Sequence, residues 1–266
     1  LITFPRILLS EINTHRMLSK NTSSSRSIPF NKMVETIKND PFIPIAWQKE
    51  HKGMQGTEYF TNEDEINQRK NWWAMAMEKA VFQASELHRV GVTKQLCNRL
   101  LEPFVWTTML ITGSREGWVN FFNLRCPQYV TPVGGKNEDG TDWVYRSRKD
   151  VIEGHSNKDN IIMMENFTEI DWLKLNKGQA EIHMMALAEC IWDSVNESTP
   201  KQLKAGEWHI PFEDKMNEHG LAQIRKSNHP PYDEVKVKIS TAMAAHTSYT
   251  TVGNEPVKSY EKWIEL

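Results

Sequence analysis

One long stretch of helical pattern limits the folds open to this chain. Between residues 62 and 91, apolar residues recur every three or four positions, which is the spacing of one helix face: Trp73, Met77, Ala80, Val81, Ala84 and Leu87. Acidic residues directly after Asn62 favour the positive end of a helix dipole, and Gly91 ends the pattern. We therefore predict one long helix whose apolar stripe is buried in a core or in a subunit interface.

Shorter patterns predict strands and helices on both sides of it. Residues 1–9 are apolar and strand-like, and residues 104–111 are almost continuously apolar, which is typical of a buried strand. Further helices are predicted over residues 94–103, after the turn at 112–114, and over 178–197. In the last helix we expect five residues to face inward: Ile182, Ala186, Leu187, Ile191 and Val195.

Composition is that of a globular chain with an ordinary core. Of its 266 residues, 39% are hydrophobic, and 32 basic residues are balanced by 34 acidic ones. This balance gives no general attraction to nucleic acid or membranes, so any anion site has to be local. No apolar run approaches the length of a membrane span. Three widely spaced cysteines argue against a disulfide framework or a zinc site, so we expect no metal. We also expect a cytoplasmic protein, which would lie in the cytoplasm of the host cell if the source is viral.

The arginine-serine run, from His15 to Ser27, has the chemistry of an anion site. Arg16 and Arg26 bracket hydroxyl and amide side chains, and the run contains no carboxylate. Arginine offers a fork of donors suited to phosphate, and serine hydroxyls and loop amides can fill the remaining oxygens. A polar surface loop is the alternative, because such clusters often mark only a turn.

The same run resembles the signature of the flavin-dependent thymidylate synthases. Six of its residues fall in register with that motif, namely His15, Arg16, Ser19, Asn21, Ser24 and Arg26, whereas Thr14, Thr22 and Ser27 replace the usual residues. Residues 94–103 are similar to the arginine-bearing helix of the family, residues 120–125 to its Asn-Phe-Phe-x-Leu-Arg element, and residues 179–182 to the region that follows. Together these blocks indicate a divergent, phage-like member.

The resemblance implies a fold, a reaction and a set of site residues. It implies an α+β fold, helix-rich with an antiparallel sheet, in a homotetramer with shared active sites. The reaction would be reductive methylation of dUMP to dTMP, with methylenetetrahydrofolate as carbon donor and NADPH reducing bound FAD. Arg125 would be catalytic, and dUMP would be held by Glu11, Thr22, Ser24, Ser25, Arg26, Arg99 and Arg125. FAD would be held by His15, Arg16, Ser19, Asn21 and Asn120.

Two other functions remain open. The replacements at Glu11, Thr14 and Thr22 are compatible with a different C5 modification of a pyrimidine nucleotide, such as hydroxymethylation. A non-catalytic protein that binds nucleic-acid phosphates is the third candidate, and the near-neutral charge of the chain counts against it.

Two segments depart from the family pattern within an expected single domain of residues 1–266. Residues 127–176 match poorly and carry turn signals, so they predict an inserted hairpin or loop. Residues 239–249 faintly resemble a segment that precedes the arginine motif in ordinary members, which suggests a permuted or truncated tail over 235–266. The family's later flavin-binding Pro-Phe-Glu-His element does not occur, so the chain either lacks it or is a fragment.

Overall fold

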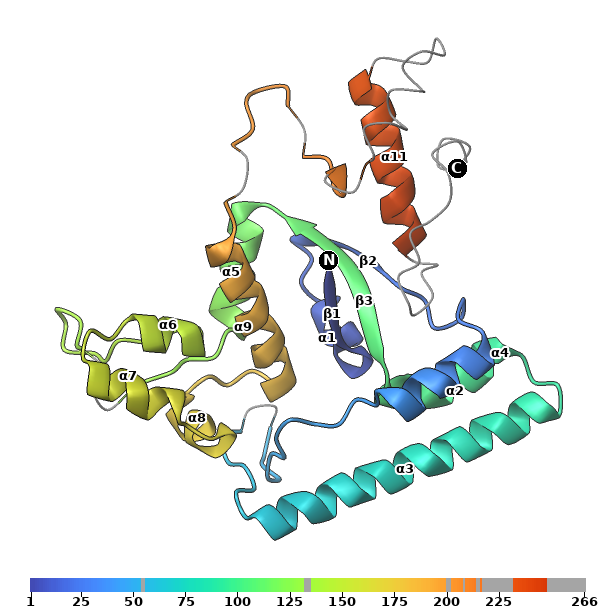
Figure 1. The fold of residues 1–266 in the computed structure, drawn as a ribbon, viewed down its shortest axis with the longest axis horizontal. Helices are drawn as coiled ribbons and strands as arrows, with labels where there is room; N and C mark the ends of the chain where they lie inside the picture. The colour runs from blue at the N-terminus through green and yellow to red at the C-terminus, as the bar shows by residue number, and fades with distance from the viewer. Residues whose placement is uncertain are drawn as a thin grey trace.

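The computed structural model describes residues 1–53, 56–131, 135–199, 202–207, 209–213, 216 and 232–247. These residues form a helix-rich α+β fold around a small antiparallel sheet, which confirms the predicted fold class (Figure 1). Among them, no helix is long and apolar enough to cross a membrane.

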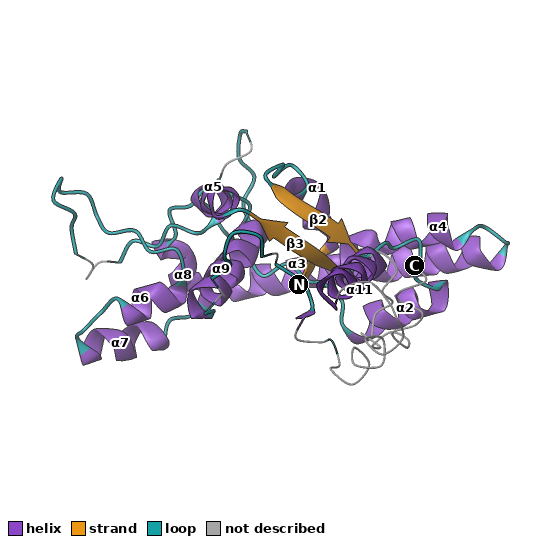
Figure 2. Ribbon diagram, turned by 90° about the horizontal axis from the view of Figure 1, so that it is seen from above, coloured by secondary structure: helices purple, strands orange, loops and turns teal. Residues whose placement is uncertain are grey.

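The sheet has three strands, and the last of them in the chain lies in the centre. Strands β1 (Ile2–Pro5) and β2 (Leu18–Thr22) both pair antiparallel with β3 (Trp106–Gly113), in the order β1-β3-β2. Figure 2 shows β2 and β3 side by side. The sequence led us to expect β3 to be wholly buried, but its residues alternate between buried and half-buried because only one face of the sheet meets the core.

Helices surround the sheet on several sides. The 3₁₀ turn η1 (Arg6–Leu8) and helix α1 (Leu9–Ile12) follow β1, and α2 (Phe30–Asn39) follows β2. The predicted long helix is α3 (Glu63–Arg89), which begins where the Asn62 side chain accepts a hydrogen bond from the Glu65 amide. Helix α4 (Lys94–Cys97) continues into the 3₁₀ helix η2 (Asn98–Phe104), so the helix predicted there is confirmed only in part.

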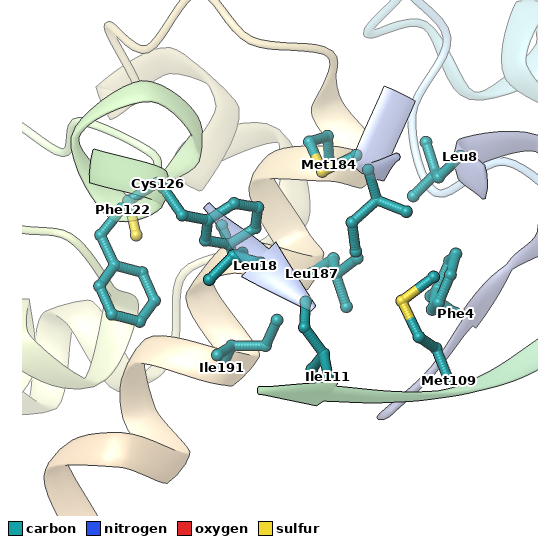
Figure 3. Close-up of a cluster of buried hydrophobic side chains, with 13 residues drawn as sticks. Phe4, Leu8, Leu18, Met109, Ile111, Phe122, Cys126, Met184, Leu187 and Ile191 are labelled. Atoms are coloured by element: carbon teal, nitrogen blue, oxygen red, sulfur yellow. The ribbon is translucent and has the colours of Figure 1, made fainter. Parts of the chain in front are cut away.

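Two helices pack against the core face of the sheet. Helix α5 (Arg115–Arg125) begins at Ser114, whose hydroxyl accepts from the Gly117 amide, as the turn signal predicted. Helix α9 (Ile182–Glu197) lies beside it (Figure 1). The apolar side chains of the sheet, α1, α5 and α9 meet in one core, part of which is labelled in Figure 3: Phe4, Leu8, Leu18, Met109, Ile111, Phe122, Cys126, Met184, Leu187 and Ile191. Val195 of α9 is exposed, so its predicted inward orientation is wrong.

A second core lies between α2, α3 and η2. It contains Met33, Ile37, Ala84, Leu101 and Phe104, with half-buried α3 residues packed around them. The stripe predicted from the sequence is therefore core, apart from Leu87, which is 38% exposed.

The poorly matching segment 127–176 is more ordered than the predicted hairpin or loop. Isolated bridges join Tyr129 to Tyr145 and to Asn176, so the segment leaves and returns at one place. Between them lie three short helices, α6 (Arg148–Glu153), α7 (Lys158–Glu165) and α8 (Glu169–Leu175), around a small core of Tyr129, Val151, Met164 and Trp172. The antiparallel bridge between Lys136 and Asp142, closed by a turn at residues 137–140, agrees with the predicted hairpin, whereas the helical unit was not predicted. Gly134, one of the turn signals, lies outside the described residues.

The last described element is helix α11 (Tyr232–His246), which covers part of the segment expected to be permuted. Its Val235 and Ile239 pack with Met216, and the Ser240 hydroxyl donates to the Pro211 carbonyl at 2.8 Å. The Asn21 amide of β2 donates to the Ala244 carbonyl, so α11 contacts the strand that carries part of the arginine-serine run. Residues 248–266 of the predicted tail lie outside the described residues.

Candidate functional site

Arg125 stands at the centre of a polar cluster where three separate segments meet. It is the last residue of α5, where the negative end of the helix dipole favours a cation. Its Nη1 lies 2.5 Å from Glu11 Oε1 of α1, and its Nε donates to His15 Nε2 at 2.9 Å. The guanidinium plane is therefore fixed on two sides by residues more than a hundred positions away in the chain.

An open cavity of about 830 Å³ adjoins this cluster. Its wall carries both charges and amides: Glu11, Thr14, Asn123, Leu124, Arg125, Gln128, Lys177, Gln179, Ala180 and Glu181. Residues from two of the sequence blocks, at 120–125 and 179–182, therefore come together with Glu11 and Thr14 at one cavity. Amides and paired charges around an open space suit a polar, hydrogen-bonding ligand.

His15 is held in its neutral form beside Arg125. The residue is only 8% exposed, and burial together with the charges of Arg125 and Lys20 lowers its pKa from 6.5 to about 4. Because Nε2 accepts from Arg125, the ring proton lies on Nδ1. The imidazole therefore acts as a fixed acceptor that orients the guanidinium, and the contact with FAD that the resemblance implies stays a prediction.

Two carboxylates face the cavity in different environments. Burial raises the pKa of Glu11 and the charge of Glu181 adds to this, while Arg125 acts in the opposite direction. The Glu181 carboxylate accepts from His183 Nδ1 at 2.5 Å and from the Met184 amide at 2.9 Å, so it also caps α9. His183 in turn accepts from the Ile45 amide at 3.0 Å, which ties the segment after α2 to this wall.

The serine-rich part of the arginine-serine run forms a second cluster. Ser25 is 2% exposed, and its hydroxyl donates to Glu102 Oε1 at 2.5 Å. The fully buried Asn98 donates to the carbonyls of Ser25 and Ile28 at 2.7 and 2.9 Å. The block at 94–103 therefore packs directly on this loop, and the Ser25 hydroxyl, which we predicted to bind dUMP, contacts Glu102 in this structure.

Arg6 secures the start of the same loop. Its Nη1 donates to the Ser23 carbonyl at 3.0 Å and to Thr107 Oγ1 at 3.1 Å, and its Nε lies 3.2 Å from Glu102. Sequence reasoning missed Arg6, Asn98 and Glu102. Asn98 and Glu102 flank Arg99 within a matched block, which was the one signal available for them.

The predicted dUMP residues fall into two groups within one copy. Glu11 and Arg125 lie beyond the start of β2, whereas Ser24, Ser25 and Arg26 follow its end. A five-residue strand spans roughly 16 Å. Thr22 ends the strand and is half-buried, as is Ser24, while Arg26 and Arg99 are exposed and available to a ligand.

The predicted FAD residues are also spread over several elements. Ser19 and Asn21 lie on the same face of β2, since side chains alternate along a strand. That face meets α11 through Asn21. Arg16 and Asn120 are exposed, the first before β2 and the second on α5. The run predicted as an anion-binding loop is therefore partly an edge strand.

Comparison with known proteins gives a distant match. No family model matches the sequence, and no curated protein matches it. Two solved structures are similar to it: crystal structures of a UMP/dUMP methylase, PolB from Streptomyces cacaoi, bound with 5-Br dUMP and with 5-Br UMP. They are 17% and 18% identical to this chain, and both matches cover 65% of it with a TM-score of 0.38. The matches span 64% and 66% of the solved chains, which is just under two thirds of their length. A similarity this distant does not identify the function of the chain.

Proposed function

We propose that this protein methylates dUMP to dTMP, with methylenetetrahydrofolate as carbon donor, FAD as the bound cofactor and NADPH as reductant. The observation that carries the proposal is the meeting of two resembling sequence blocks, 120–125 and 179–182, at one cavity, where Arg125 is held by Glu11 and His15. When residues that are distant in sequence and similar to one family's motifs meet at one site, the resemblance to that family is a stronger argument for function.

We assign Arg125 to the pyrimidine ring, and the geometry of its cluster supports this. Its Nη1 and Nε are held by Glu11 and His15, so the guanidinium has a fixed orientation before a ligand arrives. A fixed cation of this kind stabilises negative charge that develops on the ring during reaction at C5, without reorganisation. Asn123, Gln128 and Gln179 supply amides on the same wall that suit the donor and acceptor pattern of a pyrimidine.

We assign the phosphate of the nucleotide to the serine loop, which is the part of the arginine-serine run that follows β2, residues 23–27. Arg26 and Arg99 are exposed, and Ser24 is half-buried next to them in the chain. Buried Asn98, Arg6 and Glu102 fix this loop from behind, which reduces the entropy lost when it binds an anion. Because the loop and Arg125 lie beyond opposite ends of β2, we assign each complete site to more than one copy in a homotetramer.

The residues near β2 fit part of the proposed cofactor. Arg16, Ser19 and Asn120 are exposed donors that suit the diphosphate or ribityl chain of FAD, whereas His15 is already committed to Arg125. When bound, FAD supplies the hydride for the methylation. Asn21 reaches FAD only if its contact with the Ala244 carbonyl of α11 opens.

Product analysis tests this function. Purified protein is incubated with FAD, dUMP, methylenetetrahydrofolate and NADPH under anaerobic conditions, and nucleotides are identified by mass spectrometry. We expect dTMP, with a loss of about 100-fold in Arg125→Lys. Arg115→Lys, an exposed position at the start of the same helix, serves as the matched control and should stay within about twofold of the wild type. No nucleotide product under saturating FAD would refute the proposal.

A different C5 modification is the second candidate. Glu11 motivates it, because a carboxylate stands where the family usually has a glutamine and forms an ion pair with Arg125. An acceptor-only side chain beside the ring changes the electrostatics at the reacting carbon. The same assay separates the two functions: a product heavier than dTMP by one oxygen supports hydroxymethylation, whereas dTMP alone excludes it.

A further inference from the structure

Helix α3 carries a second apolar stripe on the side opposite its core-facing stripe. Trp72, Met75, Phe82 and Val90, which directly follows α3, are 58%, 51%, 60% and 65% exposed. At 100° per residue they fall within an arc of about 80°, turned away from the side that packs in the core. Figure 1 shows α3 along the lower edge of the molecule, with no other described element below it.

A surface helix normally turns polar residues to water, so this stripe needs a partner. The four exposed side chains amount to roughly 400 Å² of apolar surface, the size of the largest patch on a typical monomer, and such a patch is often functional. Two such patches facing each other contribute about 800 Å², and their polar margins bring the total near the area of a stable protein interface.

The charges within the stripe identify the partner as a second copy. Lys79 and Glu86 lie on the same arc, between the apolar residues. If two α3 helices pack antiparallel about a two-fold axis beside Phe82, Lys79 of one copy faces Glu86 of the other. The same register places Met75 against Val90. The sequence of the stripe is thus complementary to itself, as an isologous interface requires.

We propose that α3 forms a symmetric antiparallel dimer contact with the α3 helix of a second copy, centred on Phe82. Glu86 already pairs with Arg89 in its own helix at 2.8 Å. That pair is highly exposed and contributes little, so Glu86 remains able to face Lys79 of the second copy. The contact depends only on this surface and not on the reaction proposed above.

Charge reversal combined with sedimentation equilibrium tests both the surface and the register. We expect a wild-type assembly, a dissociation constant at least tenfold weaker in Lys79→Glu and in Glu86→Lys, and recovery to within about threefold of the wild type in the double variant K79E/E86K. Phe82→Glu should abolish the contact. Lys174→Glu makes the same charge change on helix α8, outside the stripe, and should have no effect.

This test is independent of the proposed reaction, because sedimentation measures assembly and not turnover. Circular dichroism and cooperative unfolding of each variant establish that it folds. A folded wild-type chain that is monomeric at 100 μM overturns the proposal, and the stripe then serves a different kind of partner. An assembly whose mass and dissociation constant are unchanged in both Phe82→Glu and Lys79→Glu uses other surfaces, which overturns the proposal as well. Single reversals that weaken assembly without recovery in the double variant refute the antiparallel register.

Discussion

Acid should destabilise this protein through His15. In the folded state its pKa is about 4, against an ordinary value of 6.5, because the ring is buried and lies beside Arg125. As the pH falls below 6.5, the unfolded chain takes up a proton at this residue and the folded chain does not, so stability is lost between pH 6.5 and about 4. The gap between the two pKa values corresponds to about 3 kcal/mol over the whole range.

Glu11 acts in the opposite direction over part of the same range. Its pKa is raised, so protonation of Glu11 as the pH falls favours the folded state. The contribution of His15 is therefore isolated by a comparison with His15→Gln, whose side-chain oxygen can accept from Arg125 Nε without titrating.

Urea unfolding at pH 7 and pH 4.5 measures the effect. Between these pH values, the wild type should lose about 2 kcal/mol more unfolding free energy than His15→Gln, because most of the His15 contribution disappears in that interval. Equal losses in the two proteins would show that burial beside Arg125 does not hold His15 neutral.

Two further substitutions test the supports of the candidate site and the inserted unit. Asn98→Ala leaves the carbonyls of Ser25 and Ile28 without their buried donor, so urea unfolding should show that the free energy of unfolding falls by about 3 kcal/mol. The exposed control Asn137→Ala should lower it by less than about 0.5 kcal/mol. Equal losses in the two variants would mean that the bonds to the loop contribute nothing. Trp172→Ala should cost about 3 kcal/mol and make segment 127–176 sensitive to limited proteolysis; unchanged protection would contradict the inserted core.

The regular elements with strong apolar periodicity were predictable from the sequence. Helix α3 has a long stripe and a clear cap at Asn62, and α5 begins at Ser114 as its turn signal indicated. Strand β2 was not predicted because four of its five residues are polar, and pairing with β3 supplies the hydrogen bonds that define it. The three helices of segment 127–176 have at most eight residues each, too few for a visible period.

The sequence could name candidate site residues but not the partners of their side chains. The resemblance pointed to Glu11, His15 and Arg125, yet only the fold shows that all three form one hydrogen-bonded cluster. It also pointed to Ser25, whose hydroxyl the fold directs to Glu102. Such pairings join residues dozens to more than a hundred positions apart, and a local pattern carries no information about them.

The binding and reduction of flavin test the central claim most directly. Purified protein is mixed with FAD, separated from free cofactor, and its absorbance spectrum is followed under anaerobic conditions as NADPH and then dUMP are added. The account predicts bound flavin that bleaches with NADPH and responds to dUMP. Protein that binds no FAD at micromolar concentrations, or bound flavin that is indifferent to both additions, would contradict it.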